Sequence, residues 1–291
     1  MKFLLFKTIL GLTALLPLRL IHWLGNLIGR LSWLSNSRIR RIASRNIELC
    51  LPELSADEQR QLVKQTLRET GKVILETGKM WRGNTEATLA LVRDCENRQL
   101  IDDALAQQRG VILAMPHYGS WELTSLYCAK HYPMTTLYAP QADARIEQLI
   151  RQARQRSGAR LVPTDNNGIR ALSRALKQGE MISILPDQSP RSNGVFVPFF
   201  GHPCYTMTLL SKLASKTGAC VIYACARRYD DSSGFKLVLR AAEEDLSQLP
   251  LQQSVEAMNR DIEALIREAP EQYQWTYKRF KQRPPGEPSI Y

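Results

Sequence analysis

Val111–Glu122 reads VILAMPHYGSWE and places a histidine and a carboxylate five positions apart, directly after a short apolar run. Val111–Met115 has the length and composition of a buried strand, Pro116 ends it, and Gly119–Lys130 has the apolar spacing of a helix. We therefore expect His117 in a strand-to-helix loop. That loop lies at the carboxyl end of a strand, the edge of an α/β sheet where ligands bind.

His117 and Glu122 are the first candidate catalytic residues. A carboxylate in the first turn of a helix is kept ionised by the helix dipole, so we expect Glu122 to fix the imidazole tautomer of His117 and raise its basicity. Such a pair would act as a general base toward a hydroxyl. The alternative for so short a pattern is a surface histidine beside an unrelated acid at a helix start.

Strands and helices alternate from Cys50 onward, which predicts an α/β fold with a mixed, mainly parallel central sheet flanked by helices. Ser55 and Glu58 form a capping box for a helix that runs toward Met80. Expected strands are Val111–Met115, Thr135–Tyr138, Arg160–Val162, Met181–Leu185, Cys220–Ala226 and Lys236–Leu239. Further expected helices are Asp143–Ser157, Gly168–Lys177, Thr206–Lys216 and Gln252–Glu268.

A second polar cluster follows the expected strand Met181–Leu185. Asp187 leaves the end of that strand much as His117 leaves its own, so the two loops are expected to share one crevice. Gln188 and Arg191 come next in the chain. The Arg-rich helix Asp143–Ser157 lies between the two loops in sequence, and its side chains suit either a solvated face or contact with phosphate, carboxylate or an oxyanion.

The apolar stretch Val195–Gly201, VFVPFFG, contains Phe199 and Phe200. Its aromatic residues can line a chain-shaped pocket, which makes both phenylalanines candidates for substrate binding. The alternative is core packing, which periodicity alone favours.

Composition describes an ordinary globular protein with a basic N-terminus. The chain has 291 residues, 44% hydrophobic and 23% charged, with a net charge of +11. Met1–Cys50 contains eight Lys or Arg and a single acid, Glu48. The six cysteines show no C-x-x-C pair, which predicts reduced thiols in the cytosol. The four histidines are too scattered for a metal cluster, so neither a metal nor another cofactor is expected.

The first 34 residues predict membrane association. Phe3–Leu18 is apolar but contains Lys7 and is shorter than the ~20 residues of a comfortable span, so it anchors or spans marginally. The leucines of Leu20–Leu34 recur at helical spacing, which predicts a helix lying in the membrane plane. The alternative is a helical hairpin packed on the core of the protein itself.

Basic residues follow this apolar segment at Arg38, Arg40, Arg41 and Arg45. Such residues favour the anionic cytoplasmic leaflet, so we expect the cytoplasmic face of the inner membrane and contact with its anionic lipids. We place a membrane anchor with its basic flank at residues 1–45 and an α/β domain at residues 46–291.

Four segments resemble one known family. His117–Glu122 resembles the H-x-x-x-x-[DE] motif of membrane acyltransferases, particularly the late acyltransferases of lipid A biosynthesis. Asn46–Glu53 resembles the N-terminal segment of that branch, and Leu185–Gln188 with Val195–Gly201 resembles its Asp loop and F-V-P-F-F element. Pro270–Pro284 resembles its terminal W-x-x-R-R-F-K-x-R-P region. The four matches occur in order and cover essentially the whole chain.

The resemblance implies a glycerolipid acyltransferase-like fold and transfer of a fatty acyl group from acyl carrier protein to a hydroxyl of a phosphorylated glucosamine lipid. His117 would be the general base and Glu122 its partner, with direct attack on the thioester. The resemblance also implies that Arg154 stabilises the oxyanion and that Asp187 orients the site. Gln188, Arg191, Phe199 and Phe200 are the expected substrate contacts. Arg191 is a rival of Arg154 for contact with phosphate or with the thioester oxygen.

Other functions compete with this one. The same chemistry can act on a lysophospholipid, a glycolipid or an ornithine lipid. A membrane-attached lipid hydrolase would use His117 to activate water. The sequence pI of about 9.5 is also compatible with a nucleic-acid-binding protein, although no binding module is recognisable and no nucleic-acid partner is expected.

Overall fold

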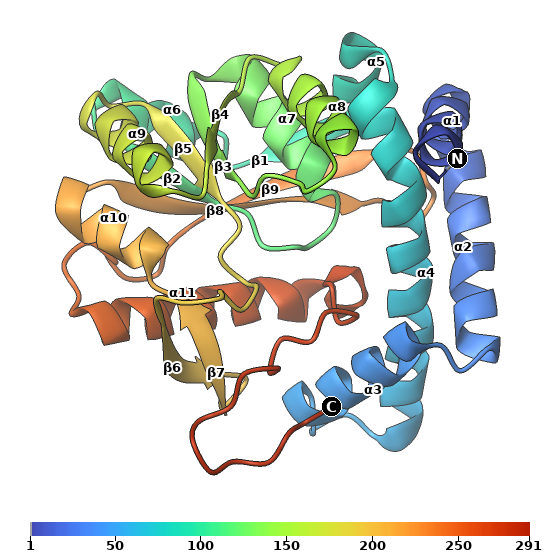
Figure 1. Ribbon diagram of the computed structural model, residues 1–291. Helices are drawn as coiled ribbons and strands as arrows, with labels where there is room; N and C mark the ends of the chain where they lie inside the picture. Colours follow the sequence, from blue (N-terminus) through green and yellow to red (C-terminus); the bar gives the residue numbers. More distant parts are fainter. Residues whose placement is uncertain (1) are drawn as a thin grey trace.

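The structure is a computed structural model that describes residues 2–291 (Figure 1). The strands of the large sheet are β1 (Val92–Glu96), β2 (Val111–Ala114), β3 (Met134–Tyr138), β4 (Arg160–Pro163), β5 (Met181–Ile184), β8 (Cys220–Arg228) and β9 (Phe235–Ala241). Their order is β1-β9-β8-β2-β5-β3-β4. Only the pair β8–β9 is antiparallel among these described strands. The expected mixed, mainly parallel sheet is therefore confirmed.

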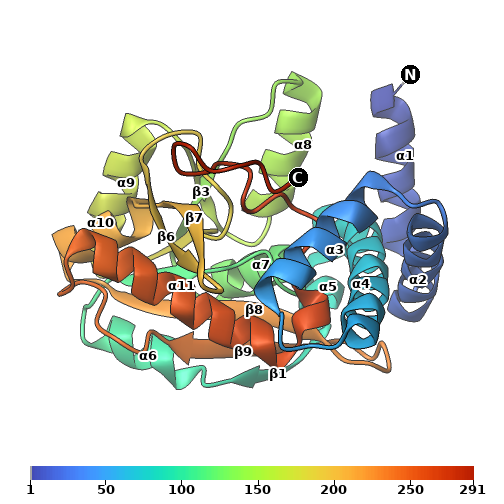
Figure 2. The ribbon, with the colours of Figure 1, turned by 90° about the horizontal axis from the view of Figure 1, so that it is seen from below.

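Helices cover both faces of this sheet (Figures 1 and 2). Ile112 and Ala114 of β2 belong to one buried cluster, which includes residues of α9 (Asn166–Lys177), α10 (Leu209–Thr217) and α11 (Leu251–Glu268). Val111 and Leu113 point the other way, into a cluster with α6 (Gln99–Ala106) and α7 (Trp121–His131). Burial on both faces explains why this strand is continuously apolar rather than alternating.

Four further α-helices and one 3₁₀ helix lie to one side of the sheet or at its edge. The long α4 (Ala56–Arg82) begins with the expected capping box, in which Ser55 and Glu58 bond each other's backbone N–H groups. It contacts α3 (Arg38–Cys50), α8 (Ala144–Gln155) and the short 3₁₀ helix η1 (Pro270–Gln272), and α5 (Thr85–Leu89) follows it. Helix α3 runs through the expected boundary at residue 45, which stays a prediction.

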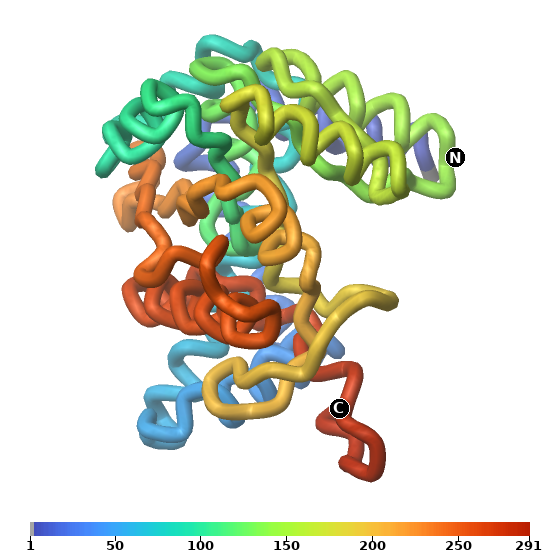
Figure 3. The backbone as a smooth tube through the Cα atoms, turned by 90° about the vertical axis from the view of Figure 1, so that its left-hand side faces the viewer, coloured from blue at the N-terminus to red at the C-terminus, as the bar shows by residue number. Residues whose placement is uncertain are grey.

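The stretch VFVPFFG forms part of a hairpin instead of a single pocket-lining segment. Strands β6 (Gly194–Phe199) and β7 (His202–Met207) pair antiparallel, separate from the large sheet. Figure 3 shows this hairpin, α3 and the C-terminal tail together at one end of the molecule. The tail ends against α3, where the hydroxyl of Tyr291 donates to the side-chain oxygen of Asn46.

The N-terminal helices α1 (Lys2–Leu15) and α2 (Leu18–Leu34) pack on the outer side of α4 (Figures 1 and 2). At the crossing of α2 and α4, a Cβ added to Gly29 would lie 2.4 Å from the Cα of Arg68, so only glycine permits this approach. The alternative of a hairpin packed on the protein's own core is thus confirmed for this side of α2.

The opposite side of α2 is apolar and exposed. We call it the outer stripe; its residues are 40–76% exposed and recur at helical spacing, at Leu20, Trp23, Leu27, Leu31 and Leu34. Among residues 2–291, no helix combines the length and the apolar character that crossing a membrane requires.

Candidate active site

His117 and Asp187 meet beyond the carboxyl ends of β2 and β5, which are neighbours in the sheet. The Asp187 carboxylate accepts two hydrogen bonds, from the backbone N–H of His117 at 2.9 Å and from the ring Nδ1 at 2.8 Å. Because a carboxylate accepts and cannot donate, this contact assigns the proton to Nδ1 and leaves Nε2 with its lone pair. The side chain of Asp187 is 2% exposed and that of His117 is 16% exposed.

The environment of Asp187 keeps it ionised. Burial raises the pKa of its carboxyl group, but the charge of His117 and the two hydrogen bonds from His117 outweigh burial and leave the pKa lowered. The pair is thus a base at Nε2 with a buried anion behind it. Such an anion orients the imidazole and stabilises the imidazolium that forms when Nε2 takes a proton.

The backbone around His117 is held by the C-terminal segment. The carbonyl of His117 accepts from the N–H of Gln274 at 3.0 Å, and Tyr118 forms an isolated antiparallel bridge with Tyr273. Gly119 has a φ of +61°, and a Cβ there would lie 2.2 Å from the carbonyl oxygen of Ala226. The loop therefore needs glycine at this position for two reasons, its left-handed backbone and its contact with β8.

Glu122 does not take the position expected for it. The imidazole of His117 bonds Asp187, while Glu122 accepts from Nε of Arg154 at 3.1 Å and from Nη2 of the same guanidinium. The turn at Gly119 brings the ring of Trp121 against the imidazole, with ring centroids 5.1 Å apart. Glu122, in the first turn of α7, reaches Arg154 of α8 and not His117. The expectation that Glu122 fixes the tautomer of His117 is therefore wrong, because Asp187 holds that position.

Glu122 and Arg154 form a partly buried pair beside this histidine. Burial raises the pKa of Glu122, and Arg154 lowers it more, so the carboxylate stays ionised; a weaker lowering comes from the charge of His117. The contact with Glu122 uses Nε and Nη2 of the guanidinium and leaves Nη1 outside that contact. A cavity of about 130 Å³ opens beside the pair, between α4 and α7, and is lined in part by Trp81, Trp121 and Glu122.

The other expected contacts fall into two groups. Gln188 lies near the site and donates to the side-chain oxygen of Gln274 at 2.9 Å, whereas Arg191 is exposed in the loop before β6. Phe199 and Phe200 are buried in the core, which corrects the expectation that they line a pocket. Their neighbours are Trp275 and Phe280 of the C-terminal segment.

These buried aromatic rings connect the four family-like segments. The amide of Asn46 donates to the carbonyl oxygens of Trp275 and Tyr277, both at 2.7 Å. Phe199 packs against Phe280, with ring centroids 6.2 Å apart. These contacts join segments that are far apart in the sequence into one scaffold under the loop of His117.

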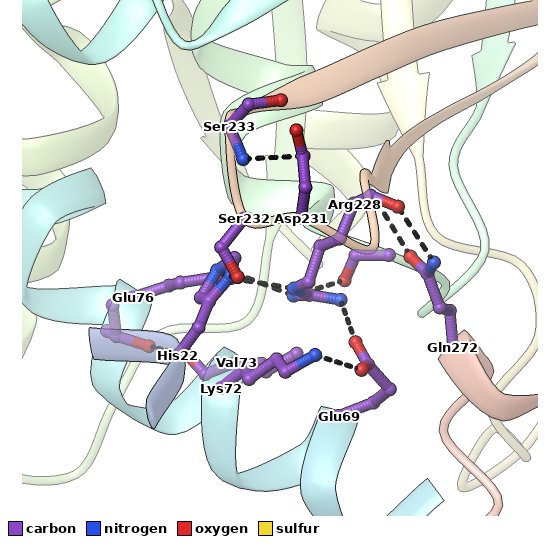
Figure 4. Close-up of polar contacts among 12 residues, drawn as sticks. His22, Glu69, Lys72, Val73, Glu76, Arg228, Asp231, Ser232, Ser233 and Gln272 are labelled. Atoms are coloured by element: carbon purple, nitrogen blue, oxygen red, sulfur yellow. Dashed lines mark hydrogen bonds and ion pairs between the residues drawn. The ribbon is translucent and has the colours of Figure 1, made fainter. Parts of the chain in front are cut away.

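A buried ionic network supports the same loop from the other side, and no motif in the sequence indicates it (Figure 4). Arg228, at the end of β8, donates to both carboxylate oxygens of Glu76 at 2.6 and 2.7 Å and to the carbonyl of Gly119 at 3.2 Å. His22 of α2 joins through a contact of 2.7 Å with Glu76. Gln272 exchanges two hydrogen bonds with the backbone of Arg228. The network therefore links α2, α4, β8 and η1 to the loop.

The chain matches the family described as bacterial lipid A biosynthesis acyltransferase over residues 2–282. It is 33% identical over 286 residues to the lipid A biosynthesis lauroyltransferase of Escherichia coli (strain K12), covering 97% of this chain and 92% of that protein. Identity to the palmitoleoyltransferase of the same organism is 32% over 290 residues, with the same two coverages. The myristoyltransferase of that strain is 25% identical over 266 residues, covering 91% of this chain and 80% of the relative.

Proposed function

The chain belongs to the bacterial lipid A biosynthesis acyltransferases, and we propose that it catalyses a late, secondary acylation, in which a fatty acyl chain passes from acyl carrier protein to a hydroxyl of a lipid A precursor. The observation that carries the mechanism is the His117–Asp187 pair, because Nδ1 of the imidazole is occupied by Asp187 and Nε2 is left to act as a base. Family membership supplies the acceptor class. Acyl carrier protein as the donor and a late, secondary acylation as the step are our proposal.

In this mechanism Nε2 of His117 takes the proton of the acceptor hydroxyl as its oxygen attacks the thioester carbonyl. The new carbon–oxygen bond forms first, and the carbon–sulfur bond then breaks. The imidazolium returns its proton to the departing thiolate. Because the acceptor hydroxyl attacks the thioester directly, no acyl-enzyme is formed. Asp187 stabilises the imidazolium throughout, and the backbone contacts of the loop keep Nε2 in place.

Arg154 is proposed as the oxyanion donor through Nη1, the guanidinium nitrogen outside its contact with Glu122. The role of Glu122 changes accordingly from partner of His117 to positioning residue for Arg154. A fixed cation directed at the developing charge is the kind of preorganised group that lowers such a barrier. Because the thioester is already activated, base and oxyanion donor suffice for the transfer.

We also propose that the N-terminal helices bind the cytoplasmic face of the inner membrane. The outer stripe presents apolar side chains to the surroundings, and Arg19 and Arg30 flank it on α2. An exposed apolar face bordered by basic residues is typical of helices that lie in the membrane interface. The lipid acceptor would then be reached without leaving the bilayer surface.

Product analysis tests the transfer reaction. Detergent-purified protein is mixed with acyl carrier proteins that bear different chains, an under-acylated lipid A precursor and lysophospholipids, and the products are identified by mass spectrometry. We expect one added acyl group on the glucosamine lipid, lost in His117→Ala and retained in the control His131→Ala, an exposed histidine of α7. An acylated lysophospholipid would show that the acceptor is a lysophospholipid and not the lipid A precursor. Free fatty acid alone would indicate a hydrolase.

A further inference from the structure

A basic pocket lies on the N-terminal side of the molecule, between α2 and α4. Its volume is about 370 Å³, and we call it the headgroup pocket; it is lined by Gly29, Arg30, Trp33, Leu34, Lys64 and Arg68. In Figures 1 and 2, α4 stands between α2 and the sheet, so this pocket is separate from the site of His117. None of its residues takes part in the mechanism above.

The headgroup pocket contains uncompensated positive charge. Within residues 2–291, Arg30, Lys64 and Arg68 form no ion pair. The nearby carboxylate of Glu69 is already bound by Lys72 at 2.5 Å and by Arg228 at 3.4 Å. Like charges four residues apart on a helix destabilise it, and Lys64 and Arg68 have this spacing. An external anion would remove that destabilisation.

Further cations surround the indole that forms one wall. The guanidinium of Arg40 lies 3.8 Å from the ring centroid of Trp33, and the ammonium of Lys64 lies 5.3 Å from it. Arg40 also donates to the carbonyl of Trp33 at 2.7 Å, which fixes the ring and the start of α3 together. Two of the cations, Arg40 and Lys64, are therefore placed against the indole by contacts within the fold.

The pocket adjoins the outer stripe. Leu34 belongs to both, and it is 76% exposed. Leu31 and Leu27 continue the apolar surface along α2 from that point. A ligand bound here would meet cations at one end and an apolar surface at the other, which is the chemistry of an anionic lipid at a membrane surface.

We propose that the headgroup pocket binds the phosphate of one anionic glycerophospholipid, whose acyl chains lie along the outer stripe. Arginine suits this role because its planar fork can bond two phosphate oxygens at once. The apolar continuation favours a lipid over an acidic protein surface, which would need cations spread across a broad area. The proposal rests on the membrane association proposed above, and it adds a defined lipid to what would otherwise be a general attraction.

The test compares pairs of variants that remove equal charge from the full chain. Lys64→Gln/Arg68→Gln alters the pocket, Arg38→Gln/Arg41→Gln alters exposed residues of α3 outside its lining, and Arg174→Gln/Lys177→Gln alters exposed residues of α9 on the opposite side. Unfolding midpoints establish that each variant is folded. Native mass spectrometry in detergent with phosphatidylglycerol then counts the lipids retained per protein.

We expect one retained phosphatidylglycerol in the wild type and in both control pairs, and none in the pocket pair. On vesicles of phosphatidylcholine with 30% phosphatidylglycerol, the general attraction of two basic residues is worth about 25-fold in binding, at about fivefold each. The α3 pair should lose at most this factor, and the pocket pair should lose more. Retention of the lipid by the pocket pair, or equal loss in the α3 pair, would overturn the proposal.

Two further outcomes separate this proposal from the others. A wild type that binds no vesicles of either composition would contradict membrane association itself, whereas binding with no difference among variants would contradict only the pocket. If the pocket pair instead raises KM for acyl carrier protein and keeps its lipid, the occupant is an acidic protein and the lipid assignment fails. Acyl transfer by the wild type in detergent is measured separately, so the reaction is judged independently.

Discussion

Asp187→Asn tests which of the two carboxylates near His117, Asp187 or Glu122, sets the tautomer of the imidazole. The backbone N–H of His117 can only donate, so the new amide must turn its oxygen toward that N–H, now 2.9 Å from Oδ2. The amide nitrogen then faces Nδ1, now 2.8 Å from Oδ1. Because that nitrogen donates, Nδ1 must accept, and the imidazole proton moves to Nε2. The site keeps its shape and loses its base.

The expected loss in kcat follows from this change of tautomer. Replacing the acid of an acid–histidine pair by its amide lowers turnover by about 10⁴-fold in a hydrolase with the same arrangement. At 1.36 kcal/mol for each factor of ten, this corresponds to about 5 kcal/mol of barrier. KM should change little, because the cavity residues are untouched. Asp187→Ala is less informative, since it also leaves the N–H of His117 without a partner, at a cost of about 1–3 kcal/mol in stability.

The assay is the initial rate of acyl transfer, with the thermal unfolding midpoint as a measure of folding. Asp103→Asn, an exposed aspartate of α6, is the matched control and should retain full activity. If folded Asp187→Asn protein retains more than about a tenth of the wild-type kcat, Asp187 does not set the tautomer of His117. The mechanism would then need another partner for the imidazole.

Three further predictions concern the pairs around the site and the membrane surface. Glu122→Gln and Arg154→Gln should each lower kcat. In a double-mutant cycle of rates, the increase in barrier for the double variant should be about 0.5–3 kcal/mol smaller than the sum of the two single increases. Additive increases would mean that the two residues act separately. Burial raises the pKa of Glu76, but Arg228 outweighs burial and lowers the pKa from 4.5 to about 2. The contribution of the Glu76 carboxylate to the free energy of unfolding is therefore complete above pH 4.5 and is lost as the pH falls toward 2. Urea unfolding between pH 5 and 3 should therefore show a slope in the wild type that Glu76→Gln reduces, and an unchanged slope would contradict this account. Neutralising Arg19, Arg38, Arg40 and Arg41 together should weaken binding to anionic vesicles most at low salt, and unchanged partitioning would show that the apolar surface suffices.

Six of the seven strands of the large sheet could be predicted, the central ones because burial on both faces makes them apolar runs bounded by breakers. The edge strand β1 was not among them, because its charged and partly exposed residues form no apolar run. Val111–Met115 and Met181–Leu185 are examples of the central strands, and their neighbouring positions in the sheet bring His117 and Asp187 together. Which carboxylate reaches the imidazole could not be predicted, because it depends on the backbone turn at Gly119. One left-handed residue directs Glu122 away from His117 and leaves the spacing in the sequence unchanged.

The hairpin β6–β7 and the packing of α2 were also hard to predict, because the sequence pattern of each fits more than one structure. Pro198 and Gly201 break the alternation of VFVPFFG, so its pattern fits a pocket wall, a strand or a core segment equally. Helix α2 is apolar on two opposite sides, one against α4 and one exposed, and periodicity alone does not say which side meets the protein. The glycines of the crossing, such as Gly29, carry that information only when the partner helix is known.

The bridge between Tyr118 and Tyr273 has a consequence for the order in which the protein is made. A ribosome releases α1 and α2 first, while Gln272, Tyr273 and Gln274 emerge only after some 270 residues have been added. The nascent chain can therefore form α1 and α2 long before the loop of His117 is braced. The brace on His117 is complete only when nearly the whole polypeptide is present. A chain that stops short of Gln272 would form its N-terminal helices and lack the contacts that fix the backbone of the candidate base.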